Sequence, residues 1–192
     1  MRLFIGIELP DDVKRAAARV ADGMRGEIAR EASRAVLRWV PPENLHITIW
    51  FIGEVDDNRA SAIRAVMSTP FAVPAFMLRI GGAGTFPPPS GDPRAVWLGL
   101  VEGRESLLPI HAEVTERLGT LGFAPEKRPY SPHLTIARVK DIRHREAPAV
   151  RGATSRAPRE IAACAIGAVT LFRSRTSPKG SQYEAVLRVP LG

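Results

Sequence analysis

The chain has only one cysteine and no long run of apolar residues. Cys164 alone cannot form an intramolecular disulfide, which is typical of a reducing compartment, and zinc sites built on several cysteines are excluded. No stretch is long and apolar enough to span a membrane. The first ten residues are apolar but interrupted by Glu8, and they lack the long apolar region of a signal peptide. We therefore expect a cytoplasmic protein without a membrane partner.

Lysine is also scarce, although the chain is basic. The net charge is +7 and the isoelectric point is about 10.4, yet only four of the 27 basic residues are lysines. Residues 1–96 hold 12 basic against 11 acidic residues, whereas residues 97–192 hold 15 against 9. A basic surface favours an anionic partner such as nucleic acid, but an arginine-rich codon usage would produce the same composition. Charge alone leaves both explanations open.

The length and the pattern of the chain indicate one mixed domain. Its 192 residues, 20.9 kDa and 45% hydrophobic content suffice for a single core, or for two small lobes that share a sheet region. Interleaved helical and strand patterns favour an α+β or α/β fold. Strands are expected at 3–9, 36–40, 46–52, 76–80, 95–100, 133–139, 165–173 and 182–189. Helices are expected to begin at Asp11 or Asp12, at Asp56–Asp57 and at Ser106, and to end near Ile28, Met67 and Gly122.

Two further stretches are expected to be irregular. Gly81–Gly84 lacks the Lys-Ser/Thr tail of a phosphate-binding loop and is followed by three prolines after Phe86, so we expect a flexible turn. Residues 140–163 are polar and basic, with weak periodicity, and are expected to be mostly loop. A surface loop is also expected at 87–93 and a turn at 174–180.

Histidine occurs only four times, and two of the four lie in a repeated motif. His46-Ile47-Thr48-Ile49 and His133-Leu134-Thr135-Ile136 both read His, aliphatic, Thr, Ile, with a proline four residues before each histidine. Alternate side chains of a strand point to opposite faces, so each His and Thr share one surface while the aliphatic residues anchor the strand. We expect the two strands to face each other across a cleft. One His-x-Thr pair is usually only a polar pair on a half-exposed strand, but two matching copies favour a catalytic site.

Two imidazoles and two threonines suit phosphoryl transfer. Imidazole exchanges protons near neutral pH, so one histidine can act as general base and the other as general acid. The hydroxyls of Thr48 and Thr135 can donate hydrogen bonds to non-bridging phosphate oxygens. No Asp, Glu or Cys stands at a ligand spacing near either motif, so we expect no metal.

The other candidate residues carry weaker signals. Arg138 lies five positions past His133 and would point away from the histidines in a regular strand, but a bulge would turn it back as a phosphate contact. His111 is expected to be a packing or surface residue beside a helical stripe. His144 is expected to be solvated, with a phosphate contact as the alternative. Cys164 has no neighbour in the sequence that indicates a nucleophile.

Three stretches carry a resemblance to a known family. Residues 2–10, 39–48 and 129–138 resemble the 2H phosphoesterase superfamily and, within it, the RNA 2′,3′-cyclic phosphodiesterases, also called 2′-5′ RNA ligases. The likeness extends over 81–87 and the final strand around Tyr183. It implies a bilobal, pseudo-symmetric α+β fold over residues 1–192, with two antiparallel-sheet lobes, helices outside and a central cleft. Each lobe would contribute one His-x-Thr strand to this single domain.

The resemblance also implies hydrolysis of a terminal 2′,3′-cyclic phosphate to a 2′-phosphate, in RNA processing, without a metal or another cofactor. It makes His46 the proton donor, His133 the proton acceptor, and Thr48 and Thr135 the phosphate clamps. The division into acid and base comes only from the resemblance. Many relatives have a lysine where this chain has Trp50, so this chain lacks that cation.

Several functional alternatives stay open at this point. The expected partners are RNA ends or small cyclic-phosphate nucleotides, bound by a monomer. A 2′-5′ RNA ligase would run the same chemistry in reverse, and a non-catalytic RNA-binding protein would use the basic half alone. Two matched histidines favour an enzyme over a binding protein. Tyr130, Trp39 or Phe86 could stack on a base, but a core position is favoured for each.

Overall fold

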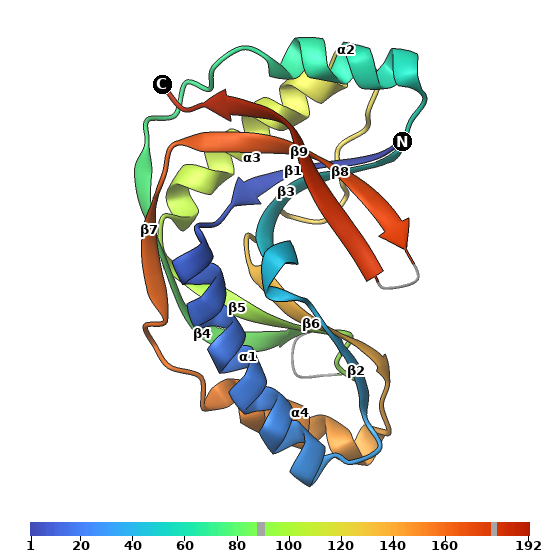
Figure 1. Ribbon diagram of the computed structural model, residues 1–192, viewed down its shortest axis with the longest axis vertical. Coiled ribbons are helices and arrows are strands. Elements are labelled where there is room, and N and C mark those ends of the chain that lie inside the picture. Colours follow the sequence, from blue (N-terminus) through green and yellow to red (C-terminus); the bar gives the residue numbers. More distant parts are fainter. Residues whose placement is uncertain (88–90, 178–179) are drawn as a thin grey trace.

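One curled antiparallel sheet runs through the molecule, and its helices pack against the outer side (Figure 1). The structure is a computed structural model, and it describes residues 1–87, 91–177 and 180–192. Within these residues the sheet has nine strands. They are β1 (Arg2–Glu8), β2 (Val36–Trp39), β3 (His46–Glu54), β4 (Phe76–Phe86), β5 (Ala95–Glu102), β6 (Leu134–Asp141), β7 (Ala162–Ile166), β8 (Ala168–Ser177) and β9 (Gly180–Pro190).

The sheet consists of two halves of four strands each along its main path. β7-β4-β5-β6 form one half and β3-β1-β8-β9 form the other, so each half ends in the strand that carries one motif. β2 pairs with β6 beside this junction. The two halves meet where Ile47 of β3 pairs with Leu134 of β6. The predicted α+β class is confirmed, and both halves belong to one sheet.

The two motif strands are neighbours, which corrects the expectation that they face each other across a cleft. β3 and β6 are antiparallel and share a residue pair, so both histidines lie on the same face of the sheet. Strand twist turns the two halves apart on either side of this junction. The sequence pattern predicted the face of each residue correctly, but it contains no information on which strand pairs with which.

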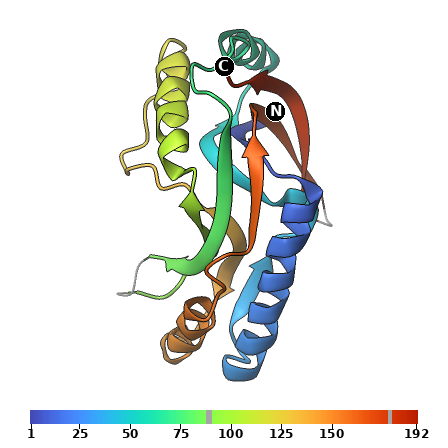
Figure 2. The same ribbon diagram turned by 90° about the vertical axis from the view of Figure 1, so that its left-hand side faces the viewer.

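In the described part of the chain, four helices cover the outer side in two pairs (Figures 1 and 2). α1 (Asp11–Glu31) packs with α4 (Ala147–Ser155) over the β4 half, and α2 (Asp57–Met67) packs with α3 (Arg104–Gly119) over the β3 half. Each long helix buries an apolar stripe: Val13, Ala17, Met24 and Ile28 on α1, and Leu107, Ile110, Val114 and Leu118 on α3. Among the described helices, none combines the length and the hydropathy that a membrane crossing requires.

α4 lies in the stretch 140–163, which was expected to be mostly loop. Val150 and Ala153 are buried against the sheet, and Pro148 lies in the first turn, where its missing N–H has no intrahelical partner to lose. β7 begins in the same stretch and pairs with β4. A helix of nine residues shows too few turns for its periodicity to stand out from a polar background.

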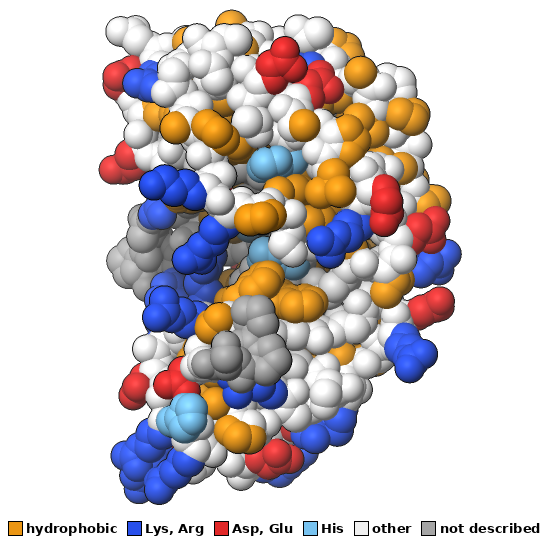
Figure 3. All heavy atoms as spheres, turned by 180° about the vertical axis from the view of Figure 1, so that it is seen from behind, with side chains coloured by type: hydrophobic (Ala, Val, Ile, Leu, Met, Phe, Trp, Pro, Cys, Tyr) orange, Lys and Arg blue, Asp and Glu red, His pale blue; other side chains and the backbone are white. Residues whose placement is uncertain are grey.

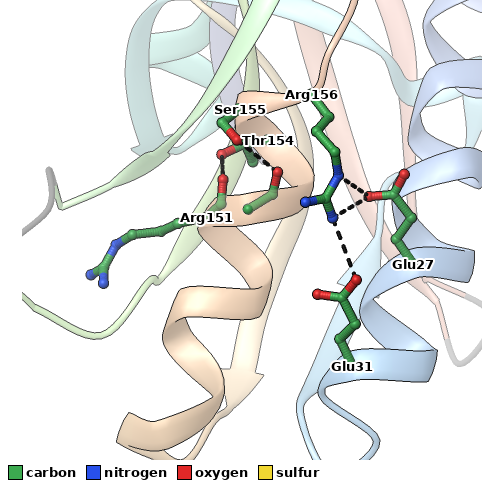
Figure 4. Close-up of polar contacts among 7 residues, drawn as sticks. Glu27, Glu31, Arg151, Thr154, Ser155 and Arg156 are labelled. Carbon is green, nitrogen blue, oxygen red and sulfur yellow. Dashed lines mark hydrogen bonds and ion pairs between the residues drawn. The ribbon is translucent and has the colours of Figure 1, made fainter.

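An ion-pair cluster links the end of α4 to α1 (Figure 4). The guanidinium of Arg156 lies 2.8 Å from the Glu27 carboxylate and 3.5 Å from that of Glu31. In the last turn of α4, the Thr154 hydroxyl donates to the Arg151 carbonyl at 2.8 Å. The exposed ion pairs link the two helices, while the buried apolar residues between them supply most of the stabilisation.

Helix starts were predicted with mixed success. Asp56 caps α2 as expected, because its side chain accepts a hydrogen bond from a first-turn amide at 2.7 Å. The cap of α1 is Pro10, and Asp11–Asp12 lie in the first turn, where carboxylates interact favourably with the helix dipole. α3 starts after Gly103, whose φ of +84° favours glycine, so Ser106 lies inside the helix.

Gly81–Gly84 lies within β4, so the predicted flexible turn is wrong. A Cβ at Gly84 would lie 2.3 Å from the Trp97 ring, and a Cβ at Gly81 would lie 1.8 Å from the Arg159 carbonyl oxygen. These glycines let a ring and a neighbouring chain segment approach the strand closely. In a sequence, glycine indicates either a turn or a position where another part of the chain packs closely against the backbone. Only the tertiary structure shows which of the two applies here.

The two remaining irregular segments differ in outcome. β8 extends to Ser177 and β9 begins at Gly180, so the stretch expected to be a turn at 174–180 is mostly strand. Residues 178–179 of that stretch, and residues 88–90 of the surface loop expected at 87–93, lie outside the described part of the chain.

We predict that Gly84→Ala lowers the free energy of unfolding by about 1–3 kcal/mol, because the new methyl group must displace the Trp97 ring. Gly23→Ala is the control. Gly23 lies within α1, and its Cβ would meet nothing within 4 Å, so this change should stabilise by about 0.4–1 kcal/mol. Urea unfolding of both variants checks the pair. An unchanged midpoint for Gly84→Ala would contradict the packing role.

Candidate active site

The two motifs place both histidines and both threonines on the inner face of the sheet, here called the histidine face. In β3, His46 is half-buried and Thr48 is exposed, while the two isoleucines of the motif are buried. At the start of β6, His133 and Thr135 are half-buried, while the two aliphatic residues of the motif are fully buried. The alternation predicted from the sequence is therefore present in both copies.

The antiparallel register brings each histidine next to the threonine of the other motif. Ile47 pairs with Leu134. The residues on either side of this pair are therefore also opposite each other. His46 lies beside Thr135, and His133 lies beside Thr48. The four polar residues form one group with approximate two-fold symmetry about the junction of the two halves.

Each imidazole is held by a backbone carbonyl two residues upstream. His46 Nδ1 lies 2.7 Å from the Asn44 oxygen, and His133 Nδ1 lies 2.7 Å from the Ser131 oxygen. A carbonyl can only accept, so each Nδ1 carries the hydrogen and each neutral ring has an unprotonated Nε2. His46 Nε2 accepts from the Thr48 hydroxyl at 3.1 Å. Both rings thus keep their basic nitrogen available for proton transfer.

Aromatic rings pack around both imidazoles. The ring centre of His46 lies 4.7 Å from that of Phe4 and 5.1 Å from that of Tyr183. His133 lies 4.9 Å from Phe86, edge to face. Phe86 therefore borders the site, although a core position was favoured for it. These contacts fix the ring planes and remove water from one side of each imidazole.

A cavity of about 180 Å³ adjoins His46. Its wall combines the aromatic rings of Phe172 and Tyr183 with an ion pair between Arg188 and Glu8 at 2.8 Å. Aromatic faces beside polar groups are typical of pockets for aromatic ligands with polar edges. A nucleoside has this chemistry.

The surroundings lower the pKa of both catalytic candidates. Burial is the largest cause for His46 and for His133, because it disfavours the charged ring. The hydrogen bonds to Asn44 and Ser131 oppose this effect. The positive charge of Arg138 lowers the pKa of both rings further. Each ring is therefore mostly neutral at pH 7 in the free protein.

A β-bulge turns Arg138 toward the histidine face. The register between β5 and β6 skips Ile136, so Ile136 and the following Ala137 both point into the core. Arg138 is exposed and acts electrostatically on both histidines. In a regular strand the Arg138 side chain would point away from the histidines, and the bulge that turns it back is present.

The other half contains the same bulge with a different outcome. The register between β1 and β3 skips Ile49, so Trp50 is also turned into the core and is only 5% exposed. Phe51, the counterpart of Arg138, then lies on the histidine face and is 47% exposed. The Arg2 guanidinium lies 5.0 Å from its ring centre. One half thus presents a cation at this position and the other presents an aromatic ring.

Tyr130 and His111 have packing roles. The Tyr130 hydroxyl donates to the Thr48 carbonyl at 3.0 Å, and burial raises the pKa of this phenol. Its ring stacks on His111 at 4.2 Å, with an angle of 3° between the planes. Trp39 packs against the core. These contacts agree with the packing positions favoured from the sequence.

The remaining candidates lie away from the motif pair. His144 has an 88% exposed side chain, as expected, and its Nδ1 lies 2.8 Å from Asp92, a partner that the sequence did not indicate. Cys164 is buried, and burial raises the pKa of its thiol. Among the described residues, no group of three His, Cys, Asp or Glu side chains is arranged to hold a metal ion.

Sequence reasoning missed the groups that orient the imidazoles. Asn44 and Ser131 act through their carbonyls, so residue type carries no signal, but both stand two positions before a motif histidine. The side-chain amide of Asn44 is buried and donates to the Ser181 carbonyl at 2.5 Å, which ties β9 to the same turn. The contact of Phe4 with His46 depends on β1–β3 pairing, which the sequence does not show.

The fold and the paired His-x-Thr strands define a 2H phosphoesterase. A profile of the 2′-5′ RNA ligase superfamily matches residues 9–178, and the chain belongs to this family. It is 32% identical to the RNA 2′,3′-cyclic phosphodiesterase of Methanothermobacter thermautotrophicus over 95% of both chains. It is 33% identical to that of Archaeoglobus fulgidus over 96% of this chain and 97% of the other. A crystal structure of a Thermus thermophilus protein is similar with a TM-score of 0.75 at 26% identity, covering 100% of this chain and 98% of that one.

We predict that Arg138→Gln raises the pKa of both His46 and His133. A nearby positive charge disfavours the imidazolium, so its removal lets each ring hold its proton to higher pH. NMR titration of the imidazole resonances in the free protein measures both values. Arg64→Gln, on the exposed side of α2, is the control and should shift neither. Unchanged values in Arg138→Gln would place Arg138 away from the site.

Proposed function

We propose that this protein hydrolyses the 2′,3′-cyclic phosphate at the end of an RNA strand and leaves a 2′-phosphate, without a metal. The observation that carries the proposal is the pair of imidazoles on one face. Each is tied through Nδ1 to its own backbone carbonyl, which leaves Nε2 as its basic nitrogen. Two relatives that are named RNA 2′,3′-cyclic phosphodiesterase support the hydrolysis of an RNA cyclic phosphate.

The geometry suggests a direct role for each polar residue. In the direction that the family resemblance implies, His133 Nε2 removes a proton from water, and the water oxygen attacks phosphorus. The bond from phosphorus to the 3′ oxygen breaks, and protonated His46 gives its Nε2 proton to that oxygen. Thr48 and Thr135 donate to the non-bridging oxygens, whose charge develops in the transition state. Arg138 adds a positive charge on the same face.

The 2′-5′ RNA ligase activity named by the family profile would use the same site. An RNA 5′-hydroxyl would replace water as the nucleophile, and loss of the 3′ oxygen would create a 2′-5′ linkage. The roles of the two histidines would not change. The two activities differ only in the nucleophile, which is water in hydrolysis and an RNA 5′-hydroxyl in ligation.

The first test is incubation of the purified protein, in EDTA, with a short RNA that ends in a 2′,3′-cyclic phosphate. The proposal requires conversion to the 2′-phosphate. His46→Ala and His133→Ala should each reduce turnover by about 10²-fold or more, because each removes one proton-transfer step. His144→Ala should retain full activity, because that side chain is exposed and remote from the motifs. Equal losses in all three variants, or loss of activity in EDTA, would refute the mechanism.

A second prediction concerns the pH dependence. The reaction needs one imidazole protonated and the other neutral, so kcat/KM should follow a bell-shaped profile set by the two pKa values of the free enzyme. Both values lie below the ordinary 6.5, so the maximum, which falls between them, should lie on the acidic side of pH 6.5. Activity is lost at lower pH as the base is protonated and at higher pH as the acid is deprotonated. A maximum above pH 7 would contradict this assignment.

A further inference from the structure

Two arginines lie directly opposite each other on neighbouring strands. Arg38 of β2 pairs with Arg138 of β6, and both are exposed. Like charges that are directly opposite destabilise a sheet. The arrangement therefore lowers stability unless an anion lies between the two guanidinium groups.

Every other arginine within the described strands has a glutamate nearby. Arg79 and Arg175 lie 3.1 Å from glutamate oxygens, and Arg188 lies 2.8 Å from one. Arg2 pairs by register with Glu54, and Arg173 pairs with Glu184. Among the ion pairs of the described residues, Arg38 and Arg138 have no carboxylate partner. Within the described strands, Arg38 and Arg138 thus lie opposite each other, and neither has a glutamate as its cross-strand or ion-pair partner.

The pair belongs to the histidine face. Across β6, the partner of Arg138 is Ala95, and the partner of Ala95 is Phe86. Cross-strand partners share a face, and the Phe86 ring lies 4.9 Å from that of His133. On this face, two positive charges therefore lie beyond the imidazoles, first Arg138 on β6 and then Arg38 on β2. Figure 3 shows Lys and Arg side chains gathered at mid-height along the left edge, where this side of the molecule is hollowed.

We propose that Arg38 and Arg138 together bind the phosphodiester that precedes the terminal nucleotide, so that the preferred substrate is an RNA strand rather than a cyclic mononucleotide. The inference rests on the proposed function. When the cyclic phosphate at the end of an RNA strand lies at the histidines, the nearest other negative charge of the strand is on the phosphodiester that precedes the terminal nucleotide. Guanidinium groups suit a phosphate because they form two parallel charge-assisted hydrogen bonds with its oxygens.

The test compares two substrates, a short RNA with a 2′,3′-cyclic end and a 2′,3′-cyclic mononucleotide. Arg38→Gln should reduce kcat/KM for the RNA by about tenfold, which corresponds to loss of one charge-assisted hydrogen bond. Its effect on the mononucleotide should be at least about five times smaller, since that substrate has no second phosphate. Arg38→Lys should recover part of the loss, and Arg64→Gln should behave as wild type. Equal losses on both substrates, or no loss on either, would overturn the proposal.

Binding separates this inference from the proposed reaction. Fluorescence anisotropy with a short RNA that ends in a 2′-phosphate gives the affinity at several salt concentrations. Each phosphate contact to a single strand contributes about 0.7 to the slope of log K against log salt, so Arg38→Gln should lower the slope by about that amount. If no cyclic phosphate is hydrolysed, the proposed function fails, and this slope still decides the role of Arg38. An unchanged slope would overturn the subsite.

Discussion

The pairing of Ile47 with Leu134 is the contact on which the rest of the site depends. Both side chains are fully buried, and they join the two halves of the sheet at its centre. Side chains of a strand alternate with a period of two, so a shift of one residue in either strand would turn its histidine toward the helices. Each buried aliphatic side chain contributes about 1.5–3 kcal/mol, which makes such a shift costly. Core packing thus keeps both imidazoles on one face.

Local backbone geometry then sets the chemistry of that face. The carbonyls of Asn44 and Ser131 select the same tautomer in both rings, and a bulge follows each motif threonine. The two halves share these devices but present different side chains, a cation at Arg138 and an aromatic ring at Phe51. A symmetric pair of imidazoles therefore lies between unlike surroundings. In the proposed reaction this asymmetry would give a bound substrate a preferred direction.

Prediction from the sequence succeeded where the signal is local. The stripe of α1 repeats over many turns, and the alternation around His46 and His133 needs only a single strand. Prediction from the sequence failed where one residue type is compatible with two structures, or where an element is too short to show a period. Gly81–Gly84 reads as a turn but admits Trp97, and the short helix around Val150 has too few turns to show a period.

The sequence by itself determined which residues are candidates for the proposed chemistry. It also determined which face of its strand each one occupies, because alternation is a property of the local backbone. The tertiary structure decided that β3 lies beside β6, that a bulge returns Arg138 to the histidines, and that Arg38 stands opposite it. Strand partners and bulges are set by pairing between residues far apart in the chain. The energy of that pairing comes from core packing and ladder hydrogen bonds, which no single stretch of sequence contains.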